Sequence, residues 1–249
     1  GFRRRGGSAL RDFAVWSALS DIHGTDWRQW PEELRDPRST AAEEFAAAQA
    51  ERVEFFEWLQ WTAQQQLSAA QTAAEEAGMG IGVLADLAVG VGKTSAETWL
   101  MGDVYAPGIT VGAPPDQYNQ GGQDWGQPPW NPLKLEELEY APFRVMVRAA
   151  LNRVGGLRID HIIGLFRLWW VPDGLGPSAG TYVRYNHEAL IGILALEARR
   201  AQALVVGEDL GTVEPWVREY LSRRGLLGTA ILWWEYGTDG QVLPPEKWR

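Results

Sequence analysis

The sequence predicts an α/β fold in which short parallel strands alternate with amphipathic helices. Residues 155–160 and 203–208 each have the pattern of a short buried strand that ends in a carboxylate. An amphipathic helix is expected between them, from Asn186 to about Ala201. Strands separated by helices pair in parallel, so both carboxylates should lie at the same end of the sheet. That end is where α/β barrels carry their catalytic residues.

The N-terminal third of the chain shows helical patterns only. Thr40 and Glu43 have the spacing of a capping box that would begin a helix. Gly78 is a typical helix stop, and a buried strand is expected at 81–85. Residues 102–133 are rich in glycine and proline and show no periodicity. A loop of that length is usually functional, so we expect a functional loop there.

The remaining elements follow clearer patterns. A helix is expected at 142–154, because its apolar residues recur at helical spacing up to Gly155. Asn186 is expected to cap the following helix, and Thr212 to cap another. Residues 229–234 have the pattern of a further strand. This alternation again favours a parallel sheet.

The composition excludes several classes of function. The 249 residues carry a net charge of −9, which disfavours a nucleic-acid surface and an anionic substrate and favours a neutral one. The absence of cysteine excludes disulfides, thiolate nucleophiles and zinc–cysteine sites, and no residue cluster predicts a metal ion or a cofactor. The chain has no apolar stretch long enough to span a membrane and no signal peptide pattern. We therefore expect a cytoplasmic protein.

Paired carboxylates break glycosidic bonds, so the two acid-ended strands suggest a site that acts on sugars. Arg158 and Asp160 are two residues apart on one strand, so their side chains face the same way. The cation would keep Asp160 ionised, as a nucleophile requires, although a structural ion pair would have the same pattern. Glu208 follows an apolar strand, a setting that favours the protonated form of a general acid.

Neighbouring residues leave alternatives open. Asp209 would either tune Glu208 by like-charge repulsion or face away and cap Gly211. Asp86 would either line the site or hold a neighbouring loop, and we favour the structural role. His161 would begin the loop above the first acid.

Two further features concern the loops. Most of the 14 tryptophans are expected in the core, but Trp125 and Trp130 lie in the Gly/Pro-rich loop, where flat rings suit stacking on sugars. A rival motif, Val-Gly-Val-Gly-Lys-Thr-Ser at 89–95, resembles the end of a phosphate-binding loop. Leu87 stands where that motif needs glycine, so nucleotide binding is not favoured.

Five segments carry a family resemblance: Gly-Leu-Arg-Ile-Asp-His, Gly-Glu-Asp-Leu-Gly, Gly-Gln-Asp-Trp-Gly-Gln-Pro-Pro-Trp, Asp-Leu-Ala-Val and the later Ser-Ala-Glu-Thr-Trp. Together they resemble the 4-α-glucanotransferases (amylomaltases, or disproportionating enzymes) of glycoside hydrolase family 77, most closely actinobacterial members, over essentially the whole chain. The resemblance implies a partial (β/α)8 TIM barrel of the α-amylase-like type at 79–249. It also implies a mainly helical insertion at 1–78 and a loop at 102–133 that covers the substrate. The implied partners are α-1,4-glucans, maltooligosaccharides and glucose, with no cofactor and no metal.

The same resemblance implies a mechanism. Asp160 would be the nucleophile of a retaining double displacement that moves an α-1,4-glucan segment onto another glucan or glucose. Glu208 would be the general acid and then the general base, and Arg158 would orient Asp160 and keep it ionised. Substrate contacts are expected from Asp86, His161, Tyr118, Trp125 and Asp209.

Two departures from the family pattern stand out. Family members often have Arg at the position of Ile163. The family's third catalytic acid lies in a Thr-His-Asp segment that would follow Arg249, so we expect an internal segment of the enzyme. On its own, such a segment would alternatively be a non-catalytic glucan-binding or structural module.

Overall fold

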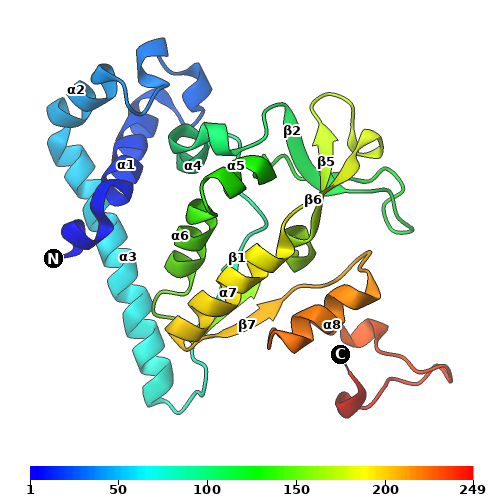
Figure 1. Ribbon diagram of the computed structural model, residues 1–249. Coiled ribbons are helices and arrows are strands. Elements are labelled where there is room, and N and C mark those ends of the chain that lie inside the picture. Colours follow the sequence, from blue (N-terminus) through cyan, green and yellow to red (C-terminus); the bar gives the residue numbers. More distant parts are fainter. Residues whose placement is uncertain (249) are drawn as a thin grey trace. The chain divides into compact units, whose positions relative to one another are not determined.

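The computed structural model describes residues 1–248 and divides into two compact units, each of which is described by itself (Figure 1). Unit 1 consists of Gly1–Ala70, Gly90–Glu137 and Trp169–Tyr182. Unit 2 consists of Gln71–Val89, Leu138–Leu168 and the chain from Val183 onwards. The predicted division at residue 78 stays a prediction.

The helices of unit 1 confirm the helical character of the N-terminal third. They are α1 (Phe2–His23), α2 (Thr40–Ala48), α3 (Ala50–Glu76, whose last turns belong to unit 2), α4 (Ala96–Leu100) and α5 (Pro132–Glu137). Helices α1 and α3 lie side by side (Figure 1), where Arg3 forms ion pairs with Glu54 and Glu57 at 3.1 and 2.6 Å. Arg52 of α3 also pairs with Asp21 of α1.

Trp30 and Trp99 lie at the centre of the core of unit 1. They are the only buried tryptophans among the side chains that the structure describes, so the expectation that most tryptophans lie in the core is wrong. The Trp30 and Trp99 rings meet edge to face, with centroids 5.7 Å apart, and both side chains are buried. Their indole N–H groups donate to the carbonyls of Gly24 and Leu34, so burial leaves neither donor unsatisfied.

Two helix starts differ from the prediction. Ser39, not Thr40, is the N-cap of α2, and its hydroxyl accepts a hydrogen bond from the Ala42 N–H at 3.1 Å. Helix α8 (Pro215–Arg223) begins after Glu214, so Thr212 is not its cap. Proline suits the first position of a helix because its missing N–H would have had no partner there.

The Gly/Pro-rich segment at 102–133 is not a structureless loop. It contains β2 (Ile109–Ala113) and β3 (Gln123–Asp124), which join β5 (Arg167–Pro172) and β6 (Thr181–Arg184) in a sheet of order β3-β2-β5-β6. Strand β2 runs antiparallel to both β3 and β5. A Cβ atom at Gly112 would overlap the Gln123 carbonyl, so only glycine allows this close pairing.

The parallel sheet predicted from the sequence lies in unit 2. It consists of β1 (Leu84–Leu87), β4 (Gly156–Ile159) and β7 (Leu204–Gly207) in the order β1-β4-β7, and all pairs are parallel. Asp86 therefore lies within β1 rather than after it, opposite Arg158 of β4. The prediction of a strand at 229–234 is wrong. A 3-10 turn forms at Leu232–Trp234, and the next bridge to β7 is made by Leu227.

Two helices beside this sheet form the core of unit 2. Helices α6 (Ala141–Ala150) and α7 (His187–Ala201) pack together through buried apolar residues, among them Val147, Ile191 and Leu194. Asn186 caps α7 as predicted, because its Oδ1 accepts a hydrogen bond from the Ala189 N–H at 3.2 Å.

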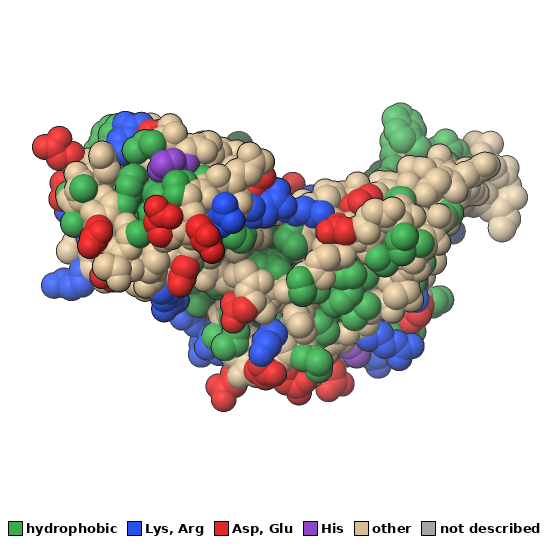
Figure 2. Space-filling model, turned by 90° about the horizontal axis from the view of Figure 1, so that it is seen from above, with side chains coloured by type: hydrophobic (Ala, Val, Ile, Leu, Met, Phe, Trp, Pro, Cys, Tyr) green, Lys and Arg blue, Asp and Glu red, His purple; other side chains and the backbone are tan. Residues whose placement is uncertain are grey.

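The surface carries charges of both signs. In the face drawn in Figure 2, acidic and basic side chains are interspersed. Among the described residues, no helix is both long and apolar enough to cross a lipid bilayer.

Candidate active site

The parallel pairing of β4 and β7 brings the two expected catalytic acids side by side in register. Ile159 is paired with Gly207, and Asp160 and Glu208 are the residues that follow them. The ladder continues one step further, because the Glu208 N–H donates to the Ile159 carbonyl at 2.9 Å. The two acids therefore leave the same end of the sheet from adjacent strands, as the sequence predicts.

Arg158 joins two carboxylates on this face of the sheet. Its Nη1 donates to Asp86 Oδ1 at 2.7 Å, and its Nη2 donates to Asp160 Oδ1 at 2.8 Å. The hydrogen bond to Asp86, and then the one to Asp160, raises the pKa of Arg158 above its ordinary value. Since all three side chains are partly exposed, the Asp160 carboxylate is held by the guanidinium yet remains accessible from solvent.

Glu208 is held by the backbone of both loops at this end of the sheet. Its Oε2 accepts a hydrogen bond from the His161 N–H at 3.0 Å, and its Oε1 accepts one from the Leu210 N–H at 2.9 Å. The Glu208 carbonyl also accepts the Ile162 N–H at 3.0 Å. The setting is therefore more polar than the apolar strand before Glu208 indicates, and it fixes the carboxylate next to the loop that follows Asp160.

His161 has an unusual backbone conformation and an uncharged ring. Its φ of 49° lies in the left-handed region, which is uncommon for residues other than glycine. Burial lowers the pKa of His161 from 6.5 to about 4, against the opposing effect of the Asp160 charge. A neutral imidazole beside the acids can both donate and accept hydrogen bonds with hydroxyl groups.

Asp209 faces away from Glu208 and into the protein. Its side chain is 5% exposed and pairs with Arg218 Nε at 3.0 Å. Its Oδ1 accepts the Thr229 N–H at 3.0 Å, while the Thr229 hydroxyl donates to the Gly207 carbonyl at 3.1 Å. The expected substrate contact of Asp209 does not fit this placement, because its carboxylate is engaged inside the protein.

Sequence reasoning missed the two residues that hold Asp209. Arg218 lies on α8, and Thr229 lies in the segment that was expected to be a strand. The chain separations of 9 and 20 residues from Asp209 have no periodic signature, so no local pattern could have found them.

The aromatic residues of the expected covering loop lie in unit 1, whereas the carboxylates lie in unit 2. Tyr118 is 78% exposed, and the Trp125 indole donates to Gln123 Oε1 at 3.0 Å. Trp130 packs on Tyr105, with ring centroids 5.1 Å apart, so it has a packing role. The contact of Tyr118 and Trp125 with sugar stays a prediction.

The lysine of the rival phosphate-loop motif is engaged within the protein. Lys93 of the rival phosphate-loop motif forms an ion pair with Asp173 at 2.8 Å. Within the described part of the chain, no group of three His, Asp or Glu side chains could hold a metal ion.

A parallel sheet whose neighbouring strands each end in a carboxylate is typical of barrel enzymes that act on carbohydrates. A family model described as Glyco_hydro_77, 4-alpha-glucanotransferase, matches residues 1–249. The chain therefore belongs to glycoside hydrolase family 77, and its α/β fold is that of a partial barrel.

Relatives from several bacteria support this assignment. The chain is 58% identical over 252 residues to a 4-alpha-glucanotransferase of Mycobacterium tuberculosis, covering 100% of this chain and 35% of the relative. It is 40% identical over 207 residues to the 4-alpha-glucanotransferase of Haemophilus influenzae, covering 83% of this chain and 30% of that protein. The chain thus spans about a third of the length of these curated relatives.

Solved structures agree on the fold. The crystal structure of amylomaltase from Corynebacterium glutamicum matches 97% of this chain and 32% of that one, with a TM-score of 0.80 and 46% identity. An amylomaltase from Streptococcus agalactiae in complex with acarbose matches 96% of this chain and 50% of that one, with a TM-score of 0.84 and 21% identity. The second match supports the fold only.

Proposed function

We propose that this chain carries the nucleophile and the general acid of a 4-α-glucanotransferase. Such an enzyme transfers a segment of one α-1,4-glucan to another glucan or to glucose. The observation that carries the proposal is the placement of Asp160 and Glu208 after neighbouring parallel strands, with Arg158 on Asp160. Membership of the family and the names of the relatives support the same activity.

The proposed reaction is a retaining double displacement. Asp160 attacks the anomeric carbon while protonated Glu208 donates its proton to the leaving glycosidic oxygen, and a glucosyl ester of Asp160 forms. Glu208, now ionised, takes the proton of an acceptor hydroxyl, which displaces Asp160 from the anomeric carbon. Arg158 keeps Asp160 ionised for the first step.

The remaining residues have proposed binding roles. Neutral His161, and Asp86 held by Arg158, would form hydrogen bonds with the sugar bound before the cleaved bond. Tyr118 and Trp125 would stack on the glucan and favour a sugar acceptor over water. Asp209 is proposed to position the loop that carries Glu208 rather than to bind substrate.

The test uses the natural polypeptide of full family length that carries these residues, called the full-length protein below. Asp160→Ala should abolish glucose release from maltotriose, because no glucosyl ester can form. The matched control is Glu76→Ala, since Glu76 is an exposed acid at the end of α3. Wild-type turnover by Asp160→Ala would rule out its role as the nucleophile.

The geometry supplies a second test. In a glucan complex the two carboxyl groups should lie about 5–5.5 Å apart, the spacing of retaining enzymes. A separation of about 9 Å would point to inversion instead and would contradict double displacement.

A second candidate function concerns the 249-residue chain alone. Because the chain spans about a third of its curated relatives, it would bind glucans without turnover when produced separately. Disproportionation of maltotriose by this chain alone would refute that view, and glucan binding without turnover would support it.

A further inference from the structure

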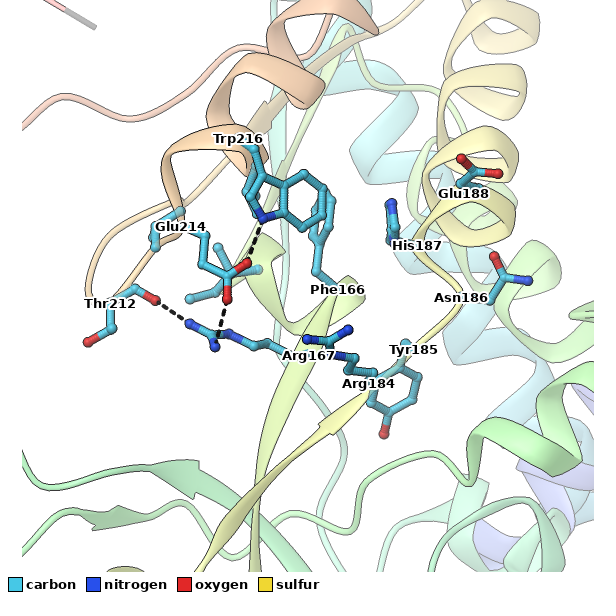
Figure 3. Close-up of a pocket in the computed structure, with 13 residues that line it drawn as sticks. Phe166, Arg167, Arg184, Tyr185, Asn186, His187, Glu188, Thr212, Glu214 and Trp216 are labelled. Carbon is cyan, nitrogen blue, oxygen red and sulfur yellow. Dashed lines mark hydrogen bonds and ion pairs between the residues drawn. The ribbon is translucent and has the colours of Figure 1, made fainter.

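Unit 2 contains a pocket of about 500 Å³, lined by residues other than the paired acids (Figure 3). It lies where the segment after Asp160 meets the first turns of α7 and α8. Its lining residues include Phe166, Arg167, Arg184, Asn186, Glu214 and Trp216. A volume of this size suits a small ligand.

An aromatic wall forms one part of this pocket. Phe166 stacks on His187 with ring centroids 4.9 Å apart and meets Trp216 edge to face at 5.6 Å. The Trp216 indole N–H donates to Glu214 Oε2 at 2.6 Å, so the ring is fixed in orientation. Trp216 nevertheless remains 44% exposed, which leaves part of a rigid flat surface available to a ligand.

Polar groups surround the aromatic wall. In Figure 3, Glu214 and Trp216 come from the α8 side, and Asn186 and Glu188 come from the α7 side. The Asn186 Oδ1 caps α7, and in Figure 3 the Asn186 side chain points away from Trp216 and Glu214. The Arg184 side chain makes no hydrogen bond or ion pair within residues 1–248, so its guanidinium is available as a donor.

The charges of the lining residues balance. Arg167 pairs with Glu214 at 3.0 Å, and Arg184 lies in the same pocket as Glu188. The lining therefore carries two guanidinium groups and two carboxylates. This balance favours a neutral ligand over a phosphate or a cation.

We propose that this pocket binds one or two glucose units of an α-glucan, outside the catalytic acids. A flat apolar ring face together with guanidinium and carboxylate groups matches a pyranose, which has an apolar face and a rim of hydroxyls. The identity of the sugar rests on the proposed function. Ile163 and Thr212 of the lining follow Asp160 and Glu208 by three and four residues, so the bound glucan lies beside the loops that carry both acids.

The test observes Trp216 directly in the full-length protein. The Asp160→Asn substitution prevents turnover. Labelling with 5-fluorotryptophan gives each tryptophan a fluorine NMR signal, and the signal that disappears in Trp216→Phe is that of Trp216. Maltose should shift the Trp216 signal saturably. Arg184→Ala should weaken this binding about tenfold, as expected for a lost hydrogen bond from a charged donor. The matched control is Arg199→Ala, since Arg199 is an exposed arginine of unit 2 in the last turn of α7, whereas the pocket lies at the first turn of that helix.

Each other outcome has a defined meaning. If maltose shifts another tryptophan signal but leaves that of Trp216 unchanged, the pocket proposal is wrong and the proposed function stands. A Trp216 signal that responds to inorganic phosphate but not to maltose would also overturn the pocket proposal. If neither maltose nor maltotriose shifts any tryptophan signal, the proposed function itself fails.

Discussion

Glu197 holds two helices of unit 2 together, and its replacement should destabilise the protein. Its side chain is 3% exposed, and its carboxylate accepts hydrogen bonds from Arg148 Nε at 2.9 Å, Arg148 Nη2 at 2.8 Å and Arg200 Nη1 at 2.8 Å. Arg148 belongs to α6, whereas Glu197 and Arg200 belong to α7. Glu197→Gln keeps the volume of the side chain and removes its charge.

The expected loss of unfolding free energy is about 2 kcal/mol. One hydrogen bond to a charged group contributes about 1.5–3 kcal/mol, and bonds that share one carboxylate are not additive. This loss of unfolding free energy is smaller than the ~3–5 kcal/mol expected when one partner of a buried ion pair is removed. The reason is that both arginine side chains are more than half exposed, so water can hydrate their guanidinium groups in the variant. The amide oxygen that the substitution leaves in place would still accept one of the N–H groups.

The pH dependence gives a second measure of the same interaction. Hydrogen bonds from Arg148, and less strongly from Arg200, lower the pKa of Glu197 from 4.5 to about 2. The stabilisation is therefore fully present above about pH 4.5 and is lost as the pH falls towards 2. Glu197→Gln should remove this part of the acid sensitivity.

The assay is urea unfolding of the full-length protein at pH 7, followed by tryptophan fluorescence. Glu76→Gln, at an exposed site, should change the stability by less than about 0.5 kcal/mol. A cycle with Arg148→Met should show that the two substitutions are coupled. If Glu197→Gln changes the stability no more than Glu76→Gln does, the ion cluster makes no net contribution and the reasoning is wrong.

Three further predictions concern the site and the sheet. In the wild type, unfolding free energy should fall as the pH drops from about 6.5 to 5, because His161 takes up a proton in the unfolded state but not in the folded state, where its pKa is about 4. His161→Asn should make this fall smaller. An unchanged pH dependence in urea titrations would contradict the prediction. Arg218→Ala should lower kcat for maltotriose about tenfold with little change in KM, because Asp209 would lose the partner that holds the loop of the general acid. Arg218→Lys should restore part of the lost kcat. An effect confined to KM would argue against a positioning role. Gly155→Ala should lower the unfolding free energy by roughly 3 kcal/mol or more, because a Cβ atom would overlap the Ile81 carbonyl. A melting temperature about equal to that of the wild type would show that the backbone can move to admit the methyl group.

The sequence predicts the parallel sheet well, because its signals are local. Apolar runs that end in an acid identify β4 and β7, and Asn186 marks the start of α7 through its capping side chain. The helix expected at 142–154 is confirmed as α6 (Ala141–Ala150), although it ends four residues earlier than expected. Each of these elements depends on residues close together in the chain.

Elements that depend on distant partners could not be predicted. Strand β2 forms because β3 and β5 supply its hydrogen bonds, and β5 lies more than fifty residues further along the chain. The same reason explains the wrong strand at 229–234, because β7 takes its next bridge from Leu227 instead. In the site, Asp209 points inward because Arg218 offers a cation there, which adjacent sequence does not reveal.

The hydrogen bonds from backbone N–H groups to Glu208 affect which inactive variant is suitable for trapping a substrate. Replacing an acid by its amide is a common way to trap a substrate, but both Glu208 oxygens accept backbone N–H groups, from His161 and Leu210. Glutamine has one oxygen acceptor, and its NH2 group would point at one of these donors. A trapped complex of Glu208→Gln would therefore show rearranged loops around the sugar, whereas Asp160→Asn leaves both amide contacts in place.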